Sequence, residues 1–286
     1  MARYKNILVA VDGSEASFHA LEESIRLAQW GKGGATVIHV APFYEGDLSL
    51  VGVKNIKATV DGPGGPILKE AMKIAELHKV SIKTVLARGE IHEGIAHHAL
   101  TEDVDLIVLG ARKTSFIAGL FAGKVLMEVI AHSSKDVLVI PDHAAIGWNK
   151  ILFPIDSLEN HMETALRVIE VAKSYGSELS VLAVTKAFFY AGGKPLSGKG
   201  CRSRECTIES LANIQIQAKH ASVKSESKLV SGRFPTVVSK IAREEHPSMI
   251  TIGLHKRTRS EWRFGRNRIK SIVHCSPCPI LLVRNS

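Results

Sequence analysis

Short runs of Val, Ile and Leu alternate with longer amphipathic segments along the chain. In the first half, these runs cover residues 6–11, 35–41, 82–87, 105–110 and 137–141. Their length and β-branched content predict buried strands. After the first run, apolar residues recur at three- and four-residue steps, which predicts a helix capped by Ser14. Its predicted buried face holds Phe18, Leu21, Ile25 and Ala28.

The same pattern returns in the second half at an offset of 143 or 144 residues. The aligned segments are 6–12 with 150–156, 88–95 with 231–238, 105–110 with 248–253, and 135–140 with 278–283. The second copy of the helix face is Met162, Leu166, Ile169 and Ala172. Four matches in one order predict two copies of one domain, residues 1–143 and 148–286, joined by a short linker at 143–147. Long loops are expected at 42–64 and 185–203, after the second strand of each copy.

Alternation of strands and helices predicts the α/β class, with an open five-stranded parallel sheet in each copy covered on both faces. In such sheets, ligands bind beyond the carboxyl ends of the strands, where the strand order reverses. The first strand leads to Asp12 and the fourth to Gly110, so these residues are expected to border a crevice. Asp12 could accept hydrogen bonds from ribose hydroxyls, and Lys113 and Lys124 could neutralise phosphates. Gly123 is expected to open a helix whose free N–H groups face an anion.

The chain resembles tandem members of the universal stress protein family over nearly its whole length. The resemblance rests on Val9–Asp12, on Asp105–Gly110 and on Cys278–Val283. It implies the Usp fold, which is similar to that of the adenine-nucleotide α-hydrolases, with strand order 3-2-1-4-5 in each copy. It also implies a pseudo-twofold axis between the copies, which pair through their final strands at 137–140 and 280–283.

ATP-binding members of that family carry Gly-x2-Gly-x9-Gly-Ser after the fourth strand. This chain keeps the spacing, with lysine at the second Gly and at the Ser. A decayed site and a site adapted by lysine both remain open. The resemblance implies ATP or another adenine nucleotide, with Mg²⁺, at Ala10, Val11, Asp12, Val40, Gly110, Arg112, Lys113, Gly123, Lys124 and Val125. The second copy departs further, and its corresponding residues are Asp156, Gly253, Lys256, Gly265, Arg266 and Asn267.

Composition and charge limit the classes of protein and the partners that need to be considered. With 45% hydrophobic and 23% charged residues, the chain has enough apolar material for a packed core. No apolar run approaches the ~18 residues of a membrane span, and four cysteines late in the chain favour the reducing cytoplasm. The net charge of +9 belongs to the second half, where 22 Lys and Arg face 11 Asp and Glu. Seven of these cations lie in residues 255–270 beside Trp262 and Phe264, a segment suited to a phosphate-bearing or acidic partner.

Other chemistry is less well supported by the residues. Residues 119–125 imitate a P-loop, but Ala118 replaces its first glycine and Val125 replaces the Ser or Thr that binds magnesium. His92 and His97 are five residues apart instead of the four of a zinc-protease helix, so these histidines are expected on an exposed helix face. One alternative stays open, a zinc site or a redox pair formed by the thiols of Cys201, Cys206, Cys275 and Cys278. Packing is favoured for the second pair, because Cys275 ends a predicted helix and Cys278 precedes the last strand.

The favoured function is a non-catalytic binding protein of stress response or signalling, with a degenerate ATP-type site in the first copy. Slow ATP hydrolysis is one alternative, and a nucleotide-independent interaction module that uses residues 255–270 is another. A protein partner or a second copy of the chain is expected. Nucleic acid and membrane are not the expected partners.

Overall fold

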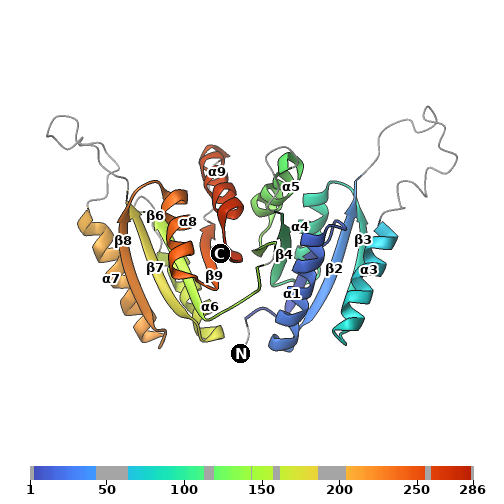
Figure 1. Ribbon diagram of the computed structural model, residues 1–286, viewed down its shortest axis with the longest axis horizontal. Coiled ribbons are helices and arrows are strands. Elements are labelled where there is room, and N and C mark those ends of the chain that lie inside the picture. Colours follow the sequence, from blue (N-terminus) through green and yellow to red (C-terminus); the bar gives the residue numbers. More distant parts are fainter. Residues whose placement is uncertain are drawn as a thin grey trace. The chain divides into compact units, whose positions relative to one another are not determined.

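The chain divides into two α/β units, Ala2–His143 and Ala144–Ser286. The computed structural model describes residues 3–42, 64–112, 119–142, 144–156, 162–185, 204–254 and 259–284. Within these ranges, only the backbone is described for 119–123, 204–205 and 259–266. Each unit alternates strands with helices, as Figure 1 shows.

The first unit contains five strands and four helices among its described residues. They are β1 (Asn6–Ala10), α1 (Glu15–Gly31), β2 (Gly34–Ala41), α3 (Gly64–Leu77), β3 (Lys83–Arg88), α4 (Ile91–Thr101), β4 (Leu106–Ala111), α5 (Gly119–His132) and β5 (Asp136–Pro141). The strands lie in the order β3-β2-β1-β4-β5, and all neighbours are parallel. The α/β class, the parallel sheet and the predicted strand order are therefore confirmed in this unit.

The second unit repeats this topology. Its elements are β6 (Lys150–Asp156), α6 (Met162–Tyr175), β7 (Glu178–Thr185), α7 (Arg204–His220), β8 (Ser225–Ser231), α8 (Phe234–Glu245), β9 (Met249–Leu254), α9 (Arg259–Cys275) and β10 (Ile280–Arg284). Its parallel strands follow the order β8-β7-β6-β9-β10, which is again 3-2-1-4-5. The long loops predicted at 42–64 and 185–203 lie almost entirely outside the described residues.

Helices cover both faces of each sheet. In the first unit, α1 packs beside α3, and α4 packs beside α5 (Figure 1). The central strands are therefore buried on both sides, which explains their continuous apolar sequence. Leu106, Ile107 and Val108 of β4, for example, are fully buried. Among the described helices, none combines the length and the apolar character that crossing a bilayer requires.

The first helix of each unit can be compared with the helix predicted from the apolar pattern. Ser14 caps α1 as predicted, with its hydroxyl accepting the backbone N–H of Ser17 at 3.2 Å. In α6, however, Leu166 was wrongly placed on the buried face, because its side chain is 43% exposed. The buried face of α6 is instead centred on Ala165, Ile169 and their neighbours.

Candidate functional site

The first unit places Asp12 at the carboxyl end of β1. The backbone N–H of Val11 still donates to the carbonyl of Ile38 in β2, at 2.9 Å, so Asp12 is the first residue beyond the sheet. The N–H of Ser14 donates to Asp12 Oδ1 at 2.9 Å, and the N–H of Asp12 donates to Ser17 Oγ at 3.3 Å. These bonds fix the turn between β1 and α1 and leave the carboxylate exposed.

The surroundings of Asp12 keep its carboxyl group ionised. Partial burial raises the pKa of Asp12, but hydrogen bonds from Ser14 and Ser17 and the positive charge of Arg112 outweigh it, so the net shift is downward. Hydrogen bonds to the charged form and nearby cations both favour ionisation. Asp12 therefore presents a negative hydrogen-bond acceptor at the end of the central strand.

The apolar residues predicted at this crevice have packing roles as well. Val11 and Val40 are buried, at 4% and 5% exposed. Val40 faces Gly94 of α4, where a Cβ would lie 3.1 Å from Val40 Cγ1. The ring Nδ1 of His39 lies 2.8 Å from the carbonyl oxygen of Val11, and since a carbonyl only accepts, His39 is the donor. His39 is not among the predicted site residues, since a lone histidine in a strand carries no motif.

Gly110, the first glycine of the family motif, is required by packing. A Cβ on Gly110 would lie 2.3 Å from the carbonyl oxygen of Ala16, in the first turn of α1. Gly253 has the same position in the second unit, where a Cβ would lie 2.4 Å from Thr164 Cγ2. Both glycines allow the first helix of their unit to approach the fourth strand. The repeat of this glycine is thus explained without a ligand.

The helix at the predicted phosphate-binding segment begins earlier in the sequence than predicted. Lys113 lies outside the described residues, and Arg112 directly follows β4 with an exposed side chain. The prediction that Gly123 opens the helix is wrong, because α5 begins at Gly119. An amide in the second turn of a helix bonds to the preceding turn, so the free N–H groups belong to the residues before Gly123. Lys124 is exposed and Val125 is half-buried.

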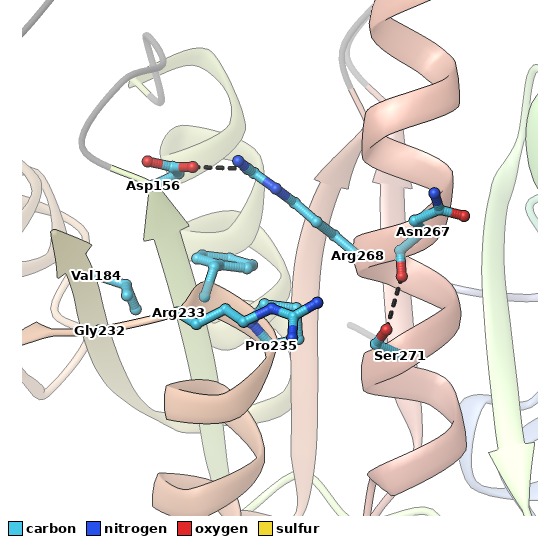
Figure 2. Close-up of a pocket in the computed structure, with 9 residues that line it drawn as sticks. Asp156, Val184, Gly232, Arg233, Pro235, Asn267, Arg268 and Ser271 are labelled. Carbon is cyan, nitrogen blue, oxygen red and sulfur yellow. Dashed lines mark hydrogen bonds and ion pairs between the residues drawn. The ribbon is translucent and has the colours of Figure 1, made fainter. Parts of the chain in front are cut away.

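In the second unit, a pocket of about 420 Å³ lies at the carboxyl end of β6, the counterpart of β1. Figure 2 shows its lining from the ends of β6 and β7, the turn before α8, and α9. The lining residues are Asp156, Val184, Gly232, Arg233, Phe234, Pro235, Asn267, Arg268 and Ser271. Two arginines and one carboxylate thus lie where the sheet topology predicts a ligand.

An ion pair crosses this pocket. Arg268 Nη1 of α9 lies 2.6 Å from Asp156 Oδ2, as the dashed line in Figure 2 marks. The Asp156 side chain is 8% exposed, and that of Arg268 is 35% exposed. The guanidinium also lies 5.7 Å from the ring centroid of Phe234, within cation–π range. Asp156, the counterpart of Asp12, is therefore engaged within its own unit.

The internal repeat shows which residues of the first unit stand at the positions of Arg268 and Arg233. At the offset of 143 residues, Arg268 corresponds to Val125, whose aliphatic side chain cannot pair with a carboxylate. Arg233, at the N-terminus of α8, likewise corresponds to Glu90 at the N-terminus of α4. The two units thus share a backbone path at this end of the sheet and differ in charge there. Arg233 is not among the predicted site residues, and Arg268 was predicted only as one cation of the basic segment 255–270, because neither residue is a motif position of the family.

The remaining residues predicted in the second copy, as far as the structure describes them, lie on β9 and α9. Gly253 lies in β9, Lys256 lies outside the described residues, and Asn267 lines the pocket. Gly265 and Arg266 lie inside α9, which begins at Arg259. The Arg266 side chain lies outside the described part of the chain.

The cysteines of the zinc alternative have different surroundings. Cys201 lies outside the described residues, whereas Cys206 and Cys275 are exposed on α7 and α9. Cys278 is buried, and this burial raises its pKa to about 11. A thiol ligand binds metal as the thiolate, so Cys278 packs as a neutral side chain.

The histidines of α4 do not all lie on an exposed face. His97 is exposed, as predicted, but His92 and His98 are half-buried. The ring centroid of His92 lies 4.9 Å from that of His132 on α5, with 46° between the ring planes. The spacing within α4 could not indicate this contact, because the second histidine comes from another helix.

Comparisons with known proteins agree on one family. The family-wide sequence model described as Universal stress protein family matches residues 3–141 and 147–284. Universal stress protein YxiE of Bacillus subtilis is 30% identical over 146 residues, 48% of this chain and 99% of the relative. A solved universal stress protein from Archaeoglobus fulgidus covers 100% of this chain and 98% of its own, with TM-score 0.74 and 17% identity. A universal stress protein solved in complex with cAMP covers 48% of this chain and 97% of its own, with TM-score 0.38 and 23% identity.

Proposed function

Because the chain belongs to the universal stress protein family in both of its halves, we propose that it is a non-catalytic adenine-nucleotide-binding protein of stress response. The nucleotide, with Mg²⁺, binds the crevice of the first unit. The second unit has the same fold and a different site. The chain therefore carries one nucleotide, although it carries two copies of the domain.

The contrast between Asp12 and Asp156 carries this proposal. Asp12 is exposed and its pKa is lowered, so an ionised acceptor is available to ribose hydroxyls at neutral pH. Asp156 is buried against Arg268 at 2.6 Å. A ligand hydroxyl could reach Asp156 only by breaking a charge-assisted hydrogen bond, which is among the stronger interactions of a protein.

Cations near the first crevice suit the phosphate end of the ligand. Arg112 follows β4 directly and is close enough to lower the pKa of Asp12. Lys124 is exposed on α5, and the first turn of a helix offers N–H groups without intrahelical partners and a positive dipole end. Charge and hydrogen bonding account for binding, whereas hydrolysis needs in addition a positioned water and a base.

Titration calorimetry of the full chain with ATP and with AMP, each with Mg²⁺, tests the proposal. One nucleotide per chain is expected. Asp12→Ala removes a charged hydrogen-bond acceptor worth about 1.5–3 kcal/mol, so affinity should fall about 10- to 100-fold. Glu76→Gln, an exposed carboxylate on α3, is the matched control and should bind as the unmodified chain does. Equal affinity of Asp12→Ala and the unmodified chain contradicts the proposal.

Hydrolysis is tested on the same samples. Release of phosphate from Mg-ATP, abolished by Lys124→Ala, would replace the non-catalytic assignment with that of a slow ATPase. The binding proposal expects intact ATP to be recovered after saturation of the site.

The pocket of the second unit supports a second function, the binding of a small phosphate-bearing ligand. Arg233 and Arg268 both line the pocket, and the N-terminus of α8, a helix of 12 residues, begins there. Helix N-termini and arginines are the usual partners of phosphate. Inorganic phosphate should shift the amide NMR signals of Gly232 and Arg233, and Arg233→Gln should remove these shifts. Unchanged signals at millimolar phosphate contradict this function.

A further inference from the structure

A cluster of two histidines and a glutamate joins α4 to α5 in the first unit. His92, Glu128 and His132 each offer one ligand atom, and these atoms all lie within 4.8 Å of one another. Glu128 and His132 lie four residues apart on α5, a spacing that places both on one helix face. His92 comes from the start of α4, and its ring lies against that of His132 at 4.9 Å.

One hydrogen bond determines which nitrogen of the His132 ring could bind a metal. Its Nδ1 lies 2.9 Å from the backbone carbonyl oxygen of Glu128. A carbonyl only accepts, so Nδ1 carries the proton and the lone pair of the neutral ring is on Nε2. This backbone bond is the usual way in which a protein orients a metal-binding histidine. The Glu128 carboxylate oxygen lies 3.7 Å from Nδ1 of the same ring.

We propose that His92, Glu128 and His132 bind one zinc ion or a similar divalent transition-metal ion. Two imidazoles and one carboxylate form a donor set that zinc uses with water in its open position. Zn–N and Zn–O bonds of ~2.1 Å place neighbouring ligand atoms about 3.4 Å apart in a tetrahedron. The ligand atoms lie within 4.8 Å of one another, and side-chain rotations that turn Nε2 of His132 toward the other two bring them to that spacing. The half-buried positions of His92 and Glu128 and the exposed position of His132 leave a path for the ion.

The repeat provides an internal comparison. At the offset of 143 residues, the three positions are Pro235, Ser271 and Cys275 in the second unit. Proline and serine cannot replace the histidine and the carboxylate, so the expected stoichiometry is one metal ion per chain. Pro235 and Ser271 also line the pocket of the second unit. The metal site therefore lies beside the equivalent crevice of the first unit.

The test uses the metal alone on the full chain, after removal of metal with a chelator and without nucleotide. Titration with ZnCl₂ in a calorimeter should give one ion per chain, and MgCl₂ should give no comparable binding because Mg²⁺ prefers oxygen ligands. His132→Ala and His92→Ala should each weaken zinc binding at least about tenfold, since loss of even an orienting partner costs 10- to 100-fold. His97→Ala, an exposed histidine on α4, is the matched control and should bind as the unmodified chain does.

Two results would overturn the proposal. The first is unchanged zinc affinity in His92→Ala and His132→Ala. The second is a thiolate-to-cobalt charge-transfer band when Co²⁺ replaces zinc, because it would assign the metal to the cysteines. Glu128→Gln preserves the shape of the side chain and provides a third variant if either alanine variant loses its circular dichroism spectrum. No nucleotide is present, so the result is independent of the nucleotide proposal.

Discussion

Replacement of Arg268 by valine tests whether the ion pair of the second crevice stabilises its unit. The change removes the 2.6 Å contact with Asp156 and the cation–π contact with Phe234, and it introduces the residue that the first unit has at this position. A hydrogen bond to a charged group contributes about 1.5–3 kcal/mol, and a cation–π contact about 0.5–1 kcal/mol where it is exposed. The guanidinium is 35% exposed, so solvent screening places the expected loss near 2 kcal/mol.

Hydrogen exchange measured by mass spectrometry can assign this loss to one unit, because two units need not unfold together. Peptides from β6 and β9 should exchange about 30-fold faster in Arg268→Val, since 1.4 kcal/mol corresponds to a factor of ten. Peptides from β1 and β4 should be unchanged. Lys270→Val, an exposed position on the same helix, is the control. Exchange within twofold of the unmodified chain, or equal acceleration in the control, would refute the reasoning.

Three further predictions concern packing, charge and thiol reactivity. Gly110→Ala should lower the free energy of unfolding of the first unit by more than about 1 kcal/mol, because the new Cβ meets backbone at 2.3 Å, whereas Gly65→Ala meets nothing within 4 Å and should be tolerated in urea unfolding. Burial raises the pKa of Glu245, but hydrogen bonds from two lysines outweigh it and lower the pKa below 4.5. Its stabilisation is therefore present above pH 4.5 and is lost as the pH falls through the lowered value, so Glu245→Gln should cost about 1–2 kcal/mol at pH 7 and little at pH 3. Native alkylation at pH 8 should modify exposed Cys275 and spare Cys278, whose pKa is about 11. Destabilisation by Gly65→Ala equal to that by Gly110→Ala, a pH-independent effect of Glu245→Gln, or rapid modification of Cys278 would contradict the respective argument.

Much of the fold could be predicted because its signals are local and occur twice. A buried strand has a continuous apolar run, and the five runs of the first half coincide with its strands to within one residue at every end. Ser14 was identified as a helix cap from the residue type and its place before an apolar periodicity. Leu166 was misplaced because the three- and four-residue steps of α6 fit two adjacent helix faces.

The sites were harder to predict, because their residues meet only in three dimensions. Arg268 reaches Asp156 across 112 positions of sequence, and no motif connects an arginine in a helix to a carboxylate at the end of a distant strand. His92 meets His132 because α4 and α5 pack side by side. The motif spacing also concealed the role of Gly110, which the contact with α1 explains by packing.

The most direct test of the central claim is the stoichiometry and affinity of ATP binding to Val125→Arg. This variant gives the first unit the arginine that pairs with the carboxylate in the second. We predict one ATP per unmodified chain, with affinity reduced at least about tenfold in Val125→Arg because Asp12 becomes paired. Two ATP molecules per unmodified chain, or unchanged affinity in a folded Val125→Arg, would contradict the account.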